Sequence, residues 1–301
     1  MKVLVTGSTG LIGSALVRHL TTHGHYVIRL VRRNPDRSRG DIAWDPATGR
    51  VERNGLEKLD AVIHLAGESL FGLWTEEKKR RIHRSRVQAT EFLTEALAGL
   101  TSRPRVILSA SAIGYYGTRA DQWLSETSGP GMGFLPSSAR SGKRHTDIAA
   151  NGGIRVATLR TGVVLSSAGG MLKKMLPAFR AGLGGQLGHG RQYLSWIDLE
   201  DLVSVIQFII ENDSLSGPIN AVAPEPVTNR DFTKALGAAL NRPTFMHVPS
   251  LFLQLLPGNM GREILLASQR VDSAKLRKAG FEFLYPTLAQ SLAHNLEGKG
   301  K

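Results

Sequence analysis

Short apolar runs alternate with amphipathic segments along the first half of the chain. Residues 3–5 and 27–31 are apolar runs of strand length, and such runs are typical of buried strands. Between them, residues 11–20 carry apolar side chains at the spacing of one helix face, and Gly24 is suited to end that helix. The segment therefore predicts a strand, a glycine-containing turn, a helix and a second strand.

The same alternation continues further along the chain. Residues 59–67, 105–111 and 154–165 are strand candidates, and residues 75–100 and about 134–150 are helix candidates. Parallel strands joined by helices form doubly wound sheets with right-handed crossovers. We therefore expect an α/β fold built on a doubly wound parallel sheet.

Composition narrows the class of protein. The 301 residues include 42% hydrophobic and 21% charged ones, which is an ordinary globular balance. The absence of cysteine excludes disulfides and thiolate metal sites, and it fits a cytoplasmic location. No apolar run approaches the ~18 residues of a transmembrane helix, so we expect no membrane partner. The histidines are scattered along the chain, and we expect no metal site.

The net charge of +13 allows three interpretations. A basic protein can attract an anionic small molecule, bind nucleic acid, or simply carry a well-solvated surface. The lysines and arginines are spread along the chain, and no aromatic-rich stacking motif accompanies them. We therefore do not expect nucleic-acid binding.

The turn after the first strand carries glycines in the sequence TGSTGLIG. Gly7 permits a tight turn, Gly10 lets the backbone approach a pyrophosphate, and Gly13 allows close packing of helix and strand. The exposed N–H groups and the helix N-terminus would then hold the phosphates. The position of this turn inside a strand–helix–strand unit makes it a strong signal for a dinucleotide site.

The end of the second strand bears on which dinucleotide is bound. An acidic residue at this point accepts the ribose hydroxyls of NAD, whereas a positive residue accommodates the 2′-phosphate of NADP. Arg32 and Arg33 stand here, and Asp36 follows only after Pro35. Guanidinium groups suit a phosphate because they are planar and permanently charged. The sequence therefore predicts NADP(H), with Arg32 and Arg33 as contacts.

Several spaced motifs carry a family resemblance over nearly the whole chain. TGSTGLIG, HLAGESL, SAIGYYG, RTGVVLSSAGGML and GLGGQLGHGRQYLSWIDLEDL together resemble the atypical extended short-chain dehydrogenases, an NAD(P)-dependent epimerase-like family often labelled cell division inhibitor. The resemblance implies a Rossmann-like sheet with a small C-terminal lobe and NADPH as cofactor. It also implies cofactor contacts at the following residues: Gly7, Thr9, Gly10, Leu11, Ile12, Gly13, Leu65, Ala66, Gly67, Arg86, Ser109, Thr161 and Gly162.

The resemblance also suggests a division of the chain. After residue 165 the pattern changes to glycine-rich segments and short helices. We expect residues 1–165 to form the NADP-binding Rossmann domain, with residues 191–222 contributing to it. Residues 166–190 and 223–301 are expected to form a small substrate lobe over the carboxyl ends of the strands, where ligands bind in such sheets.

The expected catalytic pair is missing. Ordinary members of the superfamily carry Tyr and Lys as Y-x-x-x-K on one helix, where the lysine lowers the tyrosine pKa and the tyrosine moves a proton. None of the five tyrosines here is followed by lysine four positions later, and residues 134–150 contain no tyrosine. Ser111, Tyr115 and Tyr116 remain as candidate catalytic residues. His64 is expected to be a satisfied core histidine.

Two functions stay open at this point. One is an NADP-dependent oxidoreductase or epimerase-like protein with atypical catalytic residues and an unidentified small-molecule substrate. The alternative is a non-catalytic NADPH-binding sensor or regulatory protein. By analogy with the superfamily, a homodimer is also expected.

Overall fold

A large parallel sheet forms the centre of the computed structural model, which describes residues 1–52, 55–255 and 259–297 and gives only the backbone of residues 143–148. Its strand order is β13-β8-β6-β5-β1-β2-β3-β4, and all neighbours are parallel except β3 and β4. These strands are β1 Lys2–Thr6, β2 Tyr26–Val31, β3 Ile42–Asp45, β4 Arg50–Val51, β5 Ala61–His64, β6 Val106–Ala112, β8 Arg155–Thr161 and β13 Gly217–Ala221. The expected doubly wound α/β fold is confirmed.

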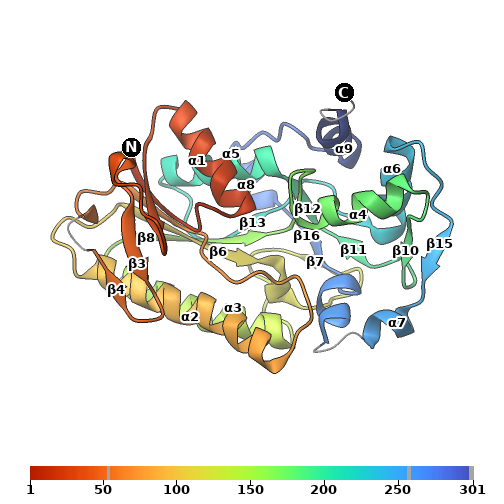
Figure 1. Ribbon diagram of the computed structural model, residues 1–301, viewed down its shortest axis with the longest axis horizontal. Helices are drawn as coiled ribbons and strands as arrows, with labels where there is room; N and C mark the ends of the chain where they lie inside the picture. Colours follow the sequence, from red (N-terminus) through yellow and green to blue (C-terminus); the bar gives the residue numbers. More distant parts are fainter. Residues whose placement is uncertain (53–54, 256–258, 298–301) are drawn as a thin grey trace.

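Alternate residues of the central strands pack against opposite helical layers. Val3 and Val5 belong to one buried cluster with residues of α1 (Leu11–Thr22) and α5 (Leu199–Glu211). Leu4, between them, belongs to a second cluster with residues of α2 (Glu76–Ala98). Successive side chains of a strand point to opposite faces, so each strand contributes to both cores. In Figure 1, α1 and α5 lie above the sheet, and α2 and α3 (Phe134–Asn151) lie below it.

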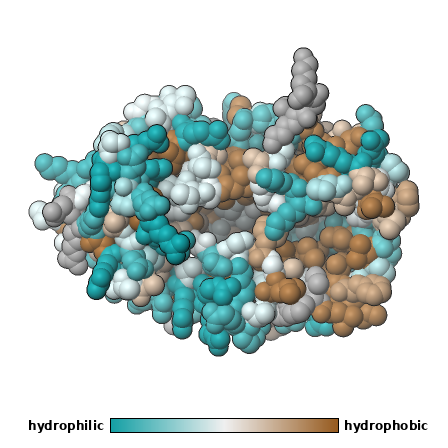
Figure 2. All heavy atoms as spheres, in the orientation of Figure 1, coloured by the Kyte–Doolittle hydropathy of each residue, from teal (hydrophilic) through white to brown (hydrophobic). Residues whose placement is uncertain are grey.

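A smaller lobe lies beside the sheet, at the right of Figure 1. Hydrophobic side chains gather on the surface of this lobe, at the lower right of Figure 2. Its buried cluster combines residues of α4, α6 and α9 with Trp196. The elements outside the main sheet, in addition to the helices named above, are β7 Trp123–Leu124, β9 Val163–Leu165, α4 Gly170–Arg180, β10 Gly185–Leu187, β11 Tyr193–Leu194, β12 Trp196–Asp198, β14 Val227–Thr228, α6 Asn229–Ala239, β15 Met246–Val248, α7 Ser250–Gln254, β16 Arg270–Val271, α8 Ala274–Lys278 and α9 Leu288–Glu297. Short 3₁₀ turns at Arg37–Arg39 and Ile113–Tyr116 and a π-turn at Gly261–Leu265 complete the described chain.

The expected strand over residues 154–165 is wrong in one respect, because the structure divides it in two. β8 stays in the main sheet, whereas β9 pairs with β12. Gly162 lies at the break, and a Cβ atom there would stand 2.7 Å from the carbonyl oxygen of Ser195. The close approach of the Ser195 backbone therefore requires glycine and directs the chain from the sheet toward the lobe.

The two helices predicted over residues 75–100 and about 134–150 are confirmed as α2 and α3. α2 begins after Thr75, whose side chain accepts a hydrogen bond from the N–H of Lys78, as an N-cap residue does. α3 is continuous over 18 residues despite its polar sequence and Pro136, because Pro is tolerated in the first turn of a helix. Among the residues that the structure describes, no helix is long and apolar enough to span a membrane.

Candidate functional site

A groove runs along the carboxyl ends of β1, β2 and β5. It is lined by Gly7, Ser8, Thr9, Gly10, Leu30, Val31, Arg32, Arg33, Trp44, Asp45, Pro46, Leu65, Ala66, Gly67, Glu68, Ser85 and Ala89. The glycine turn, both arginines and the segment 65–67, which the sequence analysis assigned to a dinucleotide site, thus line one groove. Trp44, Asp45 and Pro46 lie in the motif IAWDP, whose contribution to the groove the sequence reasoning missed.

The glycine turn has no room for a side chain at Gly7 or Gly13. Gly7 has a φ of +68°, and a Cβ on Gly13 would stand 2.2 Å from the Gly7 carbonyl oxygen. Gly10 is the N-cap of α1 and has no side chain in front of the first helical turn. The first N–H groups of a helix have no partner within the helix and carry partial positive charge. The turn therefore forms a cradle that fits a pyrophosphate.

Arg32 and Arg33 line the same groove directly after the end of β2, and both are exposed. Among the residues that the structure describes, neither has a carboxylate within ion-pair distance. Asp36, the nearest acidic residue in sequence, accepts hydrogen bonds from Ser38 and lies 3.2 Å from Arg39. Both guanidinium groups are thus available for an anionic ligand.

His64 is buried under the junction of the groove and α2, as expected for a core histidine. The Ala66 N–H donates to the Thr6 hydroxyl at 3.1 Å, so this hydroxyl donates to His64 Nδ1 at 2.8 Å. The Thr90 hydroxyl donates to the carbonyl of Arg86, so it accepts from His64 Nε2 at 3.2 Å. A neutral imidazole protonated at Nε2 satisfies every hydrogen bond in this row of side chains. Burial lowers the pKa of His64 to about 4.

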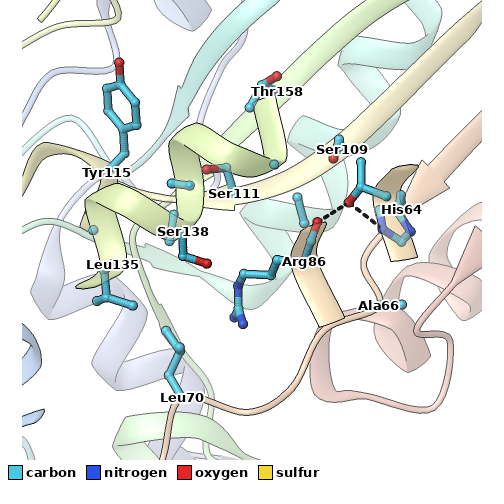
Figure 3. A pocket seen from close by; sticks show the side chains of 16 residues that line it. His64, Ala66, Leu70, Arg86, Ser109, Ser111, Tyr115, Leu135, Ser138 and Thr158 are labelled. Atoms are coloured by element: carbon cyan, nitrogen blue, oxygen red, sulfur yellow. Dashed lines mark hydrogen bonds between the residues drawn. The ribbon is translucent and has the colours of Figure 1, made fainter. Parts of the chain in front are cut away.

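A pocket continues from the groove toward α3, and Ala66 lines both. Figure 3 shows Arg86 pointing into it from α2, Ser138 from α3 and Ser111 from the end of β6. Ser109 and Thr158 also line it, together with the apolar side chains of Leu70 and Leu135. Among the described residues, the pocket therefore combines the Arg86 cation with several hydroxyl groups in a partly apolar enclosure.

Tyr115 lines the pocket from its outer end. In Figure 3 its ring extends away from Arg86 and Ser138. The guanidinium carbon of Arg160 lies 3.9 Å from the centre of the Tyr115 ring, which is cation–π geometry. Tyr115 and Ser111 also border a second pocket with Arg160. The structure thus brings Ser111 and Tyr115 to a common wall between two pockets.

Tyr116, the other candidate tyrosine, lies in the core. It is fully buried, and its hydroxyl donates to Asn220 Oδ1 at 2.7 Å and accepts from Arg160 Nη1 at 2.8 Å. Burial raises the pKa of Tyr116 above the ordinary value for tyrosine, so its hydroxyl stays protonated at neutral pH. It borders neither pocket, so we correct the expectation of a catalytic Tyr116: its hydroxyl is committed to packing.

Other expected cofactor residues have different surroundings. The Leu11 side chain lies against Gly169 and Gly170 of the lobe, so only the backbone of this residue faces the turn. Ile12 packs against the core. Thr161 and Gly162 border none of the pockets described above. Ser138 carried no motif, and only its position one helical turn before Gly142, at the i,i+4 spacing, hinted at a shared face.

Comparison with known proteins agrees with this architecture. Residues 3–222 match the model of the NAD dependent epimerase/dehydratase family, and residues 248–294 match a domain of unknown function, DUF1731. The first match covers the large sheet and the groove. The second covers most of the C-terminal part of the lobe.

Individual relatives cover nearly the whole chain. Epimerase family protein Mb2239 of Mycobacterium bovis is 42% identical over 293 residues, covering 97% of this chain and 96% of its own. The crystal structure of the human epimerase family protein SDR39U1, isoform 2, with NADPH is similar with a TM-score of 0.91 and 30% identity, covering 99% of this chain and 100% of its own. These names speak of an epimerase family and do not mention cell division. The chain belongs to the NAD dependent epimerase/dehydratase family.

Proposed function

We propose that this protein binds NADP(H) and acts as an oxidoreductase on a small carbonyl compound or its alcohol. The observation that carries the proposal is the groove, which the glycine turn lines after β1 and Arg32 and Arg33, without a carboxylate partner among the described residues, line after β2. A dinucleotide with a 2′-phosphate has anionic groups at both places. The human relative that was crystallised with NADPH supports the same choice of cofactor.

The residues present fit this cofactor. Gly7, Gly10 and the first N–H groups of α1 would hold the pyrophosphate. Arg32 and Arg33 would hold the 2′-phosphate through charge-assisted hydrogen bonds. The segment Leu65–Gly67, at the end of β5, would direct the remaining half of the cofactor toward the pocket under α3. When bound there, the nicotinamide would supply or accept a hydride.

Within the pocket, Ser111 and Tyr115 are the proposed catalytic residues. The Ser111 hydroxyl would orient a carbonyl oxygen by donating a hydrogen bond. Tyr115 would exchange a proton with the substrate from the outer wall. Because the residue four positions after Tyr115 is not a lysine, proton transfer would differ from the relay of ordinary short-chain dehydrogenases. The adjoining substrate pocket supports this function over that of a non-catalytic sensor.

A titration with NADPH and NADH tests the proposal. The double variant Arg32→Glu, Arg33→Glu should lose roughly hundredfold or more in NADPH affinity and little in NADH affinity, because charge-assisted hydrogen bonds contribute about 1.5–3 kcal/mol each and about 1.4 kcal/mol is a tenfold change. The matched control is Arg84→Glu, Arg180→Glu, which changes the same net charge at two exposed arginines outside the groove. Equal losses in the two variants, or no binding of either cofactor by the wild type, would contradict the proposal.

The cellular setting is part of the same proposal. A cytoplasmic location would give the protein access to NADPH, and a homodimer is the expected assembly by analogy. Size-exclusion chromatography with light scattering measures the assembly directly.

A further inference from the structure

Arg86 forms no ion pair with any carboxylate of the described residues, although the Glu68 carboxylate is near enough to act on it electrostatically. Its Nη1 donates to the carbonyl oxygens of Glu68 and Ile82, each at 3.3 Å. Within the described part of the chain, no carboxylate lies within 4.0 Å of this guanidinium, because the Glu68 carboxylate pairs with Lys78 at 2.6 Å and Arg81 at 3.6 Å. Burial lowers the pKa of Arg86. Charges removed from water are normally paired, so the pocket is electrostatically incomplete.

Ser138 is the second incomplete group in the same pocket. It is 2% exposed, and its hydroxyl has no hydrogen-bond partner among the described residues. Figure 3 shows its side chain directed into the space between Ser111 and Arg86. A buried hydroxyl without a partner destabilises the folded protein. A ligand oxygen at this place would remove that cost.

The helix leaves space for such a ligand. Gly142 follows Ser138 by one turn and lines the same pocket. Among the described residues, the atom nearest to a Cβ placed there is the Arg86 carbonyl oxygen, at 3.6 Å, so α3 presents no side chain to the pocket at this position. The guanidinium is positioned by its hydrogen bonds to the carbonyl oxygens of Glu68 and Ile82.

We propose that Arg86 and Ser138 bind a carboxylate of the substrate, which makes the substrate class a small carbonyl compound bearing a carboxylate, such as a 2-oxo acid or the corresponding 2-hydroxy acid. The planar guanidinium fork matches carboxylate geometry, and the Ser138 hydroxyl adds a donor from the opposite helix. Ser111, at the end of β6, is left for the carbonyl oxygen. The reaction assigned to this substrate rests on the proposed function, whereas the anion subsite stands on the pocket alone.

A second source could supply the same oxyanion chemistry. A phosphate of the cofactor would also satisfy Arg86, as the family resemblance implies. However, Arg86 lines the pocket under α3 rather than the groove that contains the glycine turn. The experiment must therefore separate substrate carboxylate from cofactor phosphate.

Binding of oxamate, an unreactive analogue of a 2-oxo acid, tests the proposal by calorimetry. The wild type is titrated with and without saturating NADPH, and the variants are Arg86→Met, Arg86→Lys and Ser138→Ala. Matched controls are Arg84→Met and Ser137→Ala, exposed residues on the same two helices. Separate titrations give the NADPH affinity of every variant, and circular dichroism checks folding.

We expect Arg86→Met to weaken oxamate binding at least about tenfold and Ser138→Ala about three- to tenfold, in line with charge-assisted hydrogen bonds. Arg86→Lys should lie between Arg86→Met and the wild type, the controls should match the wild type, and NADPH affinity should change less than about twofold. If Arg86→Met fails to fold, Arg86→Lys and Ser138→Ala decide the matter.

Two results would overturn the proposal. One is oxamate binding that is absent from the wild type or unchanged in Arg86→Lys and Ser138→Ala. The other is a tenfold loss of NADPH affinity in the Arg86 variants without a loss in oxamate affinity, which would assign the cation to a cofactor phosphate. Failure of the wild type to bind NADPH would instead refute the proposed function. The oxamate titration without NADPH would still test whether Arg86 and Ser138 bind a carboxylate.

Discussion

Acidification is expected to destabilise the folded protein through His64. In the folded state the imidazole accepts from Thr6 at Nδ1 and donates to Thr90 at Nε2. A proton added at Nδ1 would displace the Thr6 hydroxyl proton and place an unpaired charge in the core. The unfolded chain has no such constraint, and its histidine has the ordinary pKa of 6.5. As the pH falls, the unfolded state therefore binds a proton at His64 that the folded state does not bind, and the free energy of unfolding decreases.

The size of the effect follows from the two pKa values. The folded-state pKa of His64 is about 4, below the unfolded value of 6.5. Stability due to this group is therefore complete above about pH 6.5 and is lost as the pH falls toward about 4. Each pKa unit corresponds to about 1.4 kcal/mol, so the loss approaches about 3 kcal/mol in total and is about 2 kcal/mol at pH 5.

Urea unfolding at pH 7 and pH 5 measures this loss for the wild type and for His64→Gln. Gln lacks a group that titrates, so its loss between the two pH values should be smaller than the wild-type loss by about 2 kcal/mol. Comparing the two losses removes the contributions of all other groups and any constant cost of the substitution. His189→Gln, at an exposed histidine, is the matched control. Equal losses in wild type and His64→Gln would refute the reasoning.

Three further substitutions test other parts of the structure. Tyr116→Phe removes the hydroxyl bonded to Arg160 and Asn220 and should cost about 1–3 kcal/mol in urea unfolding; it should leave NADPH affinity unchanged, and a lost affinity would argue for a role in the site. Gly13→Ala would place a Cβ 2.2 Å from the Gly7 carbonyl oxygen and should abolish detectable NADPH binding in a fluorescence titration, whereas wild-type affinity would show that the turn is not the cradle. Glu263→Gln weakens a carboxylate that accepts from the N–H groups of Phe134 and Leu135 at the start of α3; a loss of about 1 kcal/mol is expected, and an unchanged melting temperature would exclude it.

Most of the fold could be predicted from local sequence patterns. The main strands were predicted from short apolar runs, and the main helices from the helical spacing of apolar residues and from caps such as Thr75. The break between β8 and β9 was different, because it depends on the Ser195 backbone approaching Gly162. That contact joins residues far apart in the sequence, and a single glycine within an apolar run does not reveal it.

Two parts of the candidate site could be inferred from the sequence because each depends on a local feature. The glycine turn depends on the backbone of a short motif, and the Arg32–Arg33 pair depends on charge at the end of a strand; both line the groove. The tyrosines were harder to separate, because Tyr115 and Tyr116 are adjacent in sequence but meet different surroundings. The environment of Tyr116 comes from Arg160 and Asn220, which are remote in the chain, so sequence proximity to the strand end could not decide between the two.

The absence of a Tyr–Lys pair changes what the pocket under α3 can do. A lysine can give up a proton or lower the pKa of a neighbouring tyrosine, whereas arginine stays charged at any ordinary pH. The cation that enters this pocket comes from α2 as Arg86, and α3 contributes a hydroxyl and a glycine, Ser138 and Gly142. These groups can hold and orient an anion, and arginine itself is a poor proton donor. We therefore propose substrate positioning as the role of these residues, and Tyr115 at the outer wall remains the proposed proton-transfer group.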